Sequence, residues 1–118
     1  LMVGFVLARS EAGPVCFHRG ARLQLSESEP GPFAGREDLA VVIRGVTDLM
    51  AMPSAGDLVI YGVGAPGGHV SYVPEIGAHA GTAPEEMNTF IMHPRNVTVP
   101  LPLLHPLQLY DHFSRYSG

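Results

Sequence analysis

Charged side chains are scarce in this sequence. They make up 15% of the 118 residues, against roughly 25% in an average soluble chain, and the formal net charge is −4. No cluster of basic residues occurs, so a surface that follows the phosphates of a nucleic acid is excluded. A surface this poor in charge suggests that part of it is normally covered, either by another part of a larger protein or by a second copy of the chain.

Cysteine and long apolar runs are scarce as well. The single Cys16 excludes an internal disulfide and a CxxC metal motif. The apolar runs are far shorter than the ~20 residues that a helix needs to cross a bilayer, so we expect no membrane span in this segment. The sequence begins with Leu1 and shows no initiator methionine or leader. We therefore expect it to belong to a longer protein, and its compartment stays open.

Glycine and proline, in contrast, are abundant, with 14 and 11 residues respectively. They predict many turns between short elements. The apolar segment 1–8 predicts a strand, and segments 14–18 and 21–25 predict a hairpin that turns at Arg19-Gly20. A loop is expected over 26–35, and further strands are expected at 56–62, 69–75 and 88–94.

Between these strands the hydrophobic period changes to that of a helix. One apolar stripe at helical spacing contains Leu39, Val42, Ile43, Val46, Leu49 and Met50. Glu37 and Asp38 would lie in the first turn, and Pro53 would end the helix. A closing helix is predicted over 106–116, with Pro106 in its first turn. The predicted class is α/β: a mixed sheet of short strands, an amphipathic helix at about 37–50 and a C-terminal helix.

The most unusual segment is Gly77-Ala-His-Ala-Gly81, where His79 stands among residues with almost no side chain. Such neighbours allow unusual backbone angles and let a ligand approach closely. The simpler interpretation is a glycine-rich turn that carries an ordinary loop histidine. Directly after it, Thr82 and Glu85 fit a capping box, which predicts that a short helical turn begins there.

Other patterns give weaker indications of chemistry. His69, His79 and His93 could form a three-histidine metal site if their segments fold together. The glycine-rich segment 62–68 lacks the Lys-Ser/Thr ending of a phosphate loop. The glycosylation triplet at 96–98 is short enough to arise by chance. No nucleophile elbow is present, and Cys16 has no activating neighbour in the sequence.

The order of these pieces resembles the C-terminal part of the alkaline-phosphatase superfamily, in its type I phosphodiesterase/nucleotide pyrophosphatase branch. The resemblance is carried by the strand "DLVIYG", a turn, the strand "HVSYVPEIG", the glycine-bracketed "AHAG", a short helical start and the apolar "MNTFIMHP". It covers residues 55–95. The family has His-Gly at its last metal ligand, whereas this sequence has His-Ala-Gly.

The resemblance implies that His79 is a metal ligand, with Gly77 and Gly81 forming a loop that a ligand can approach closely. It implies a divalent metal, usually zinc, in the intact protein, and a larger α/β/α sandwich of which 1–118 would be the C-terminal part. The remaining metal ligands of the family lie upstream, so we expect the chain alone to be catalytically inactive and to hold no metal. The alternative is a stand-alone, non-enzymatic domain that oligomerises.

Overall fold

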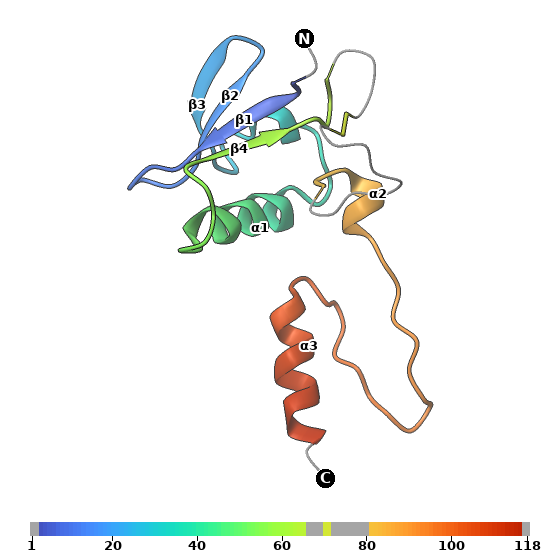
Figure 1. The fold of residues 1–118 in the computed structure, drawn as a ribbon. Helices are drawn as coiled ribbons and strands as arrows, with labels where there is room; N and C mark the ends of the chain where they lie inside the picture. Colours follow the sequence, from blue (N-terminus) through green and yellow to red (C-terminus); the bar gives the residue numbers. More distant parts are fainter. Residues whose placement is uncertain (1–2, 66–69, 72–80, 117–118) are drawn as a thin grey trace. The chain divides into compact units, whose positions relative to one another are not determined.

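The computed structural model describes residues 3–65, 70–71 and 81–116 (Figure 1). The chain divides into two compact units, Leu1–Asn88 and Thr89–Gly118, which are described separately below. The first unit contains a four-stranded antiparallel sheet and a long helix, and the second contains the C-terminal helix. The predicted α/β class is therefore confirmed.

The sheet is built from four short strands in the order β3-β2-β1-β4. Every pairing between neighbouring strands is antiparallel. The strands are β1 (Phe5–Ala8), β2 (Val15–His18), β3 (Ala21–Gln24) and β4 (Leu58–Tyr61). β1 thus lies at the centre, next to β4, although 49 residues separate the two in the sequence, from Arg9 to Asp57.

β2 and β3 form the predicted hairpin, with His18 paired to Ala21 across a two-residue turn. Both turn residues have positive φ, 49° at Arg19 and 80° at Gly20. This geometry matches the right-handed twist of the flanking strands, and glycine adopts it without steric cost. The prediction of a hairpin that turns at Arg19-Gly20 is confirmed.

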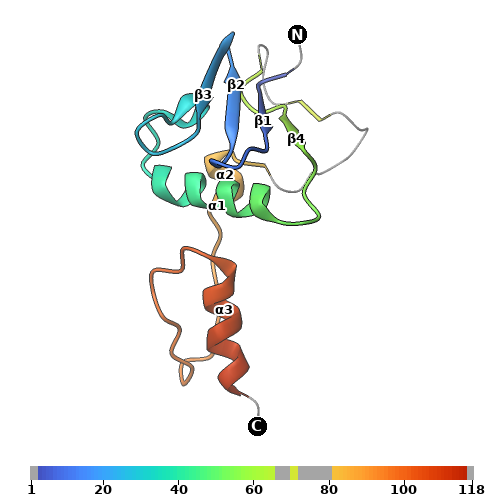
Figure 2. The same ribbon diagram turned by 90° about the vertical axis from the view of Figure 1, so that its left-hand side faces the viewer.

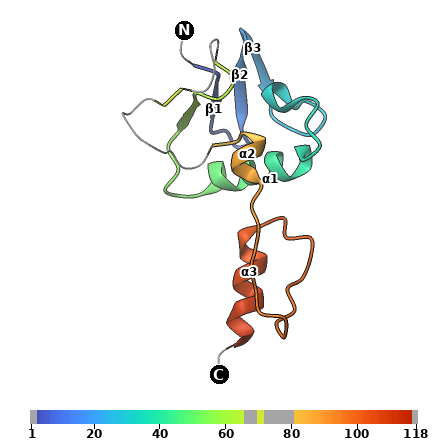
Figure 3. The same cartoon turned by 90° about the vertical axis from the view of Figure 1, so that its right-hand side faces the viewer.

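α1 (Leu39–Ala51) lies across one face of the sheet (Figures 2 and 3). Its buried residues, Val42, Ile43, Val46 and Met50, all belong to the stripe that the sequence predicts. The helix begins two residues later than expected. Asp38 is the residue before it, but its side chain makes no capping hydrogen bond to the helix, because the carboxylate binds Arg36 instead. Met52 is already extended, directly before Pro53.

The core lies between α1 and the facing side of the sheet, which we call the inner face. Strand register explains its composition: Leu7 pairs with Cys16 and Val59, Cys16 pairs with Leu23, and all four point to the same side. Phe5 stacks on its partner Tyr61 with ring centroids 4.6 Å apart. It also meets Phe33 edge-on at 5.3 Å. Phe33 comes from η1 (Gly31–Phe33), a single 3₁₀ turn within the predicted loop.

Two further strands are predicted, at 88–94 and 69–75, and neither is found as a strand among the described residues. The segment 88–94 forms no strand, so that prediction is wrong. Phe90 and Met92 are 81% and 86% exposed, and no strand within the described residues pairs with them, so their apolar character is not matched by burial. Of the predicted strand 69–75, only Val70 and Ser71 lie within the described residues; Val70 donates its N–H to the Gly62 carbonyl oxygen at 3.2 Å. The segment in between, α2 (Pro84–Met87), is the short helix expected there.

The second unit contains the predicted closing helix, as α3 (Pro106–Phe113) followed by the 3₁₀ turn η2 (Ser114–Tyr116). His105 caps α3: its ring Nδ1 accepts from the Leu107 amide at 3.2 Å. Gln108 returns the interaction, since its Oε1 accepts from the His105 amide at 2.8 Å. Across the described parts of the chain, no helix combines the length and the apolar character that crossing a bilayer requires.

The packing of α1 leads to a test of the core. Replacing Val42 or Ile43, which are 1% and 7% exposed, by alanine should lower the free energy of unfolding by about 1–4 kcal/mol. Chemical denaturation of each variant measures this. Arg44→Ala, on the exposed side of the same helix, is the control and should change stability by no more than about 0.5 kcal/mol. Equal effects at positions 42 and 44 would contradict the observed packing.

Candidate functional site

Of the three residues in the predicted metal loop, only Gly81 lies within the described residues. His79 and Gly77 lie outside them, as does His69. A Cβ atom at position 81 would overlap the carboxylate of Glu86. This carboxylate accepts from the Ala83 amide at 3.1 Å, but it is the far end of a flexible side chain and can move aside, so the contact does not by itself require glycine at position 81.

The capping interaction at α2 is shifted by one residue from its predicted position. Ala83, not Thr82, precedes the helix, and the carboxylate of Glu86 returns to that residue. The side chain of the predicted Glu85 lies outside what the structure describes. The side chain of Ala83 cannot accept a hydrogen bond, so only the returning half of a capping box is formed. Pro84 occupies the first helical position, where its missing N–H costs nothing, and this fixes where the helix starts.

The described histidines do not form a metal centre. His93 is exposed, with its ring Nδ1 3.0 Å from the carbonyl oxygen of Pro94. His105 caps α3, and His18 ends β2. Among residues 3–65, 70–71 and 81–116, no group of three or more His, Cys, Asp or Glu side chains could hold a metal ion. The described residues thus supply no donor set for zinc.

Cys16 is a core residue rather than a nucleophile. It is fully buried on the inner face of the sheet, and its thiol is free. Burial raises the pKa of this thiol to about 11, so the reactive thiolate is not formed at neutral pH. A buried, protonated cysteine packs as a small apolar side chain.

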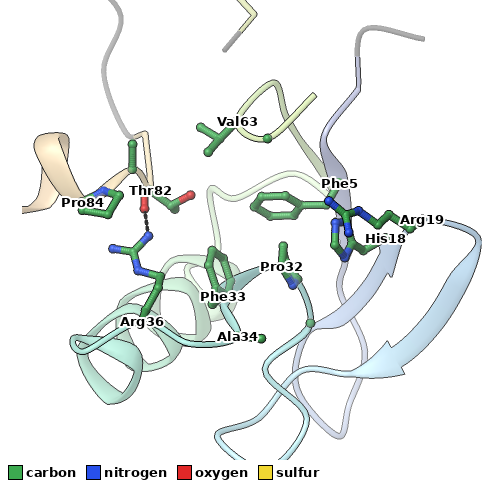
Figure 4. Close-up of a pocket in the computed structure, with 13 residues that line it drawn as sticks. Phe5, His18, Arg19, Pro32, Phe33, Ala34, Arg36, Val63, Thr82 and Pro84 are labelled. Carbon is green, nitrogen blue, oxygen red and sulfur yellow. Dashed lines mark hydrogen bonds between the residues drawn. The ribbon is translucent and has the colours of Figure 1, made fainter. Parts of the chain in front are cut away.

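The structure instead contains a pocket of about 420 Å³ in the first unit. Its apolar part is formed by Phe5, Phe33, Pro32 and Val63. Figure 4 shows Thr82 and Arg36 on one side of these residues, and His18 and Arg19 on the other. The volume falls within the range of small-molecule sites, roughly 300–1,000 Å³. Of the described residues that line the pocket, none is acidic.

Arg36 connects the start of α1 to the segment that precedes α2. Its Nε and Nη2 donate to the two carboxylate oxygens of Asp38 at 2.7 and 2.6 Å, and its Nη1 donates to the carbonyl oxygen of Thr82. The hydrogen bond from Arg36 holds the pKa of the Asp38 carboxyl below its usual value, against a smaller opposing effect of burial. The charge of Arg36 is therefore already neutralised, and its role at the pocket is structural.

Thr82 is the least satisfied polar residue of the pocket. It is 5% exposed, and within the described part of the chain its hydroxyl oxygen is buried without a hydrogen-bond partner. A buried polar group in this state costs about 1–3 kcal/mol of stability. Such a cost calls for an explanation, for example a ligand or water that completes the hydrogen bond.

The opposite side of the pocket carries charge. Burial, and to a smaller extent the positive charge of Arg19, lowers the pKa of His18, so its imidazole is neutral at pH 7. Arg19 is exposed, and no salt bridge to it occurs among the described residues. Sequence reasoning missed this pocket because its walls come from five separate parts of the chain. In the sequence, Thr82 after a glycine fits a helix cap, and nothing local distinguishes it as a residue that lines a pocket.

A second feature is the sheet face opposite α1, which we call the outer face. By strand register it carries Val6, Ala8, Val15, Phe17, Arg22, Gln24, Leu58 and Ile60. Phe17, Leu58 and Ile60 are 43%, 62% and 52% exposed. The two polar residues, Arg22 and Gln24, both lie on β3 at one edge. The outer face is thus apolar across three of its four strands.

Comparisons with models of protein families, with curated proteins and with solved structures find no match to this chain.

The Arg36–Asp38 pair leads to a pH test. Because the pKa of Asp38 is lowered in the folded chain, its contribution is present above the unfolded value of about 4 and is lost as the pH falls through the folded value. Asp38→Asn should lower the melting temperature at pH 7 and flatten its decline below about pH 4. Thermal unfolding from pH 2 to 7 measures both. Asp48→Asn, in an exposed pair with Arg44, should change the melting temperature little at any pH. Equal pH profiles for the two variants would contradict the stabilising role of the Arg36–Asp38 pair.

Proposed function

We propose that this chain is a non-catalytic interaction domain that packs through its outer face. The observation that carries the proposal is the exposure of three large apolar side chains, Phe17, Leu58 and Ile60, on the apolar part of the outer face formed by β1, β2 and β4. Antiparallel sheets commonly have one apolar face on the core and one polar face in water. A sheet that is apolar on both faces is typical of one that is covered on both.

The free energy that burial of apolar side chains would release also indicates that the outer face is covered. Full burial of one large aliphatic or aromatic side chain stabilises by about 1.5–3 kcal/mol. Three such residues, Phe17, Leu58 and Ile60, remain substantially exposed on one face. Contiguous exposed apolar patches usually mark an interface. The low charge content of 15% fits the same conclusion, since it leaves few charged side chains to cover the face.

A second copy of the chain is the occupant that fits best. Two sheets pack face to face when apolar side chains interdigitate between them. The outer face has an apolar part on β4, β1 and β2 and a polar edge on β3, where Arg22 and Gln24 lie. Protein interfaces usually combine an apolar centre with a polar rim; here the polar rim lies along the β3 edge, while the apolar part reaches the opposite edge at β4. Packing of two such faces would bury the apolar strands and leave β3 at the rim.

Sedimentation of the purified chain tests this proposal. The chain should form dimers or higher oligomers at micromolar concentration, and Ile60→Lys should shift it to monomer because it places a charge in the apolar interface. Met52→Lys is the matched control, since Met52 is 49% exposed but follows α1 rather than lying on the outer face. It should leave the oligomer intact. A wild-type chain that stays monomeric at high concentration would contradict self-association and favour coverage by a larger polypeptide.

A second candidate is the C-terminal part of a metal-dependent phosphoric-ester hydrolase, with His79 as one metal ligand. Two observations support it: β4 forms within "DLVIYG" and α2 forms at the short helical start, two of the segments that carry the resemblance. Within the described sheet, however, β4 is an edge strand and not the expected core strand. The missing strand at 88–94 counts against it. In this role the chain would contribute one imidazole, whereas a catalytic zinc takes three protein ligands. Activity would then require the whole protein.

Metal analysis and phosphodiester hydrolysis by the whole protein test the second candidate. The whole protein should contain a divalent metal and hydrolyse the phosphodiester. Residues 1–118 alone should neither hold the metal nor hydrolyse the substrate. His79→Ala should remove most of the activity and lower the metal content. The free energy of unfolding should change by no more than about 1 kcal/mol. His93→Ala, at an exposed histidine, is the control and should preserve both. A whole protein without metal or turnover would exclude the hydrolase.

A further inference from the structure

We propose that the pocket in the first unit binds a small aromatic carboxylate that carries a second polar group at its opposite end. Arg19 would pair with the carboxylate, Phe5 and Phe33 would contact the ring, and Thr82 would bind the second polar group. Each part of this assignment comes from a separate property of the pocket. It uses the inner-face side of the sheet and does not depend on the outer face.

The walls select for an apolar, planar group. Phe5 and Phe33 meet edge-on at 5.3 Å, and Pro32 and Val63 extend the apolar surface. Phe5 is held in place because its other side stacks on Tyr61 at 4.6 Å. A rigid aromatic wall favours a second aromatic ring, through offset or edge contacts at 4.5–7 Å between centroids. The wall is therefore fixed before a ligand binds, although Phe5 and Phe33 are each only 2% exposed.

The charges select for an anion. Of the two arginines that line the pocket, Arg36 is already bound by both oxygens of Asp38. Arg19 forms no salt bridge to any described residue, and none of the described lining residues is acidic. A guanidinium binds a carboxylate through two parallel hydrogen bonds. His18, neutral at pH 7, adds a hydrogen-bonding group there without a second charge.

Thr82 selects for a second polar group. Its hydroxyl is buried and unpartnered among the described residues, although Arg36 already holds its carbonyl oxygen. The residue is thus fixed by its backbone while its side chain has unused hydrogen-bonding capacity. A ligand hydroxyl or carbonyl would complete that hydrogen bond. The cost of the unpartnered hydroxyl in the ligand-free chain is then explained by its use in binding.

Calorimetric titration of the chain with 4-hydroxycinnamate tests the proposal. The acid should bind, and its uncharged amide should bind more weakly. Arg19→Gln should weaken binding of the acid about fivefold and bring it close to that of the amide. Arg22→Gln makes the same change of charge on the same hairpin, but on the outer face, and should have no effect. Absence of binding at millimolar acid, or equal effects of the two arginine variants, would overturn the proposal.

Variants of Thr82 provide a second test of the proposed binding. Thr82→Val should raise the melting temperature of the ligand-free chain, because it removes an unpartnered buried hydroxyl, and should weaken binding about tenfold. Thr82→Ser keeps the hydroxyl and should preserve binding. A valine variant that is more stable and binds equally well would show that Thr82 does not contact the ligand, and would overturn the proposal. Ile60→Lys should leave binding unchanged, so failure of the outer-face proposal remains distinguishable.

Discussion

The structure of the first unit depends on one contact: the apolar stripe of α1 packed against the inner face of the sheet. Val42, Ile43, Val46 and Met50 on the helix meet Phe5, Leu7, Cys16 and Tyr61 on the strands. Successive side chains of a strand point to opposite faces of the sheet. The neighbours of each strand residue that packs against the helix therefore point to the outer face. The same alternation that gives Leu7 its place in the core puts Val6 and Ala8 on the outer face. The core and the exposed apolar face are therefore two consequences of one constraint.

The parts of this arrangement that rest on local patterns could be predicted from the sequence. The helical stripe from Leu39 to Met50 repeats over three turns, and this repetition is the strongest local signal that a sequence gives. The β2–β3 hairpin follows from Arg19-Gly20, because the turn requires positive φ and Gly20 adopts it freely. Helix α3 was also predicted, although its cap, His105, was not. A histidine ring rarely takes the place of a serine or aspartate at that position.

The predictions that failed were those that depended on distant partners. Segment 88–94 has the composition of a strand, but a strand exists only where another strand pairs with it, and composition does not supply one. Asp38 was expected in the first turn of α1, and the structure places it one residue before the helix because Arg36 binds its carboxylate. The sequence around Thr82 fits a helix cap, yet α2 begins only at Pro84, two residues after Thr82. The pocket is lined by residues from five separate parts of the chain, so no local sequence pattern predicts it.

The pocket and the outer face belong to opposite sides of the same four strands. Phe5 lines the pocket and its neighbour Val6 lies on the outer face; likewise His18 lines the pocket and Phe17 lies on the outer face. The two surfaces are connected through the backbone of β1 and β2, and also through β4, where Ile60 lies on the outer face and its neighbour Tyr61 stacks on Phe5. β1 and β2 pair at Val6–Phe17, Leu7–Cys16 and Ala8–Val15, and a packed sheet resists small displacements. The first unit could therefore bind a ligand on one side and pack against a second chain on the other, with each contact made by residues that the other does not use.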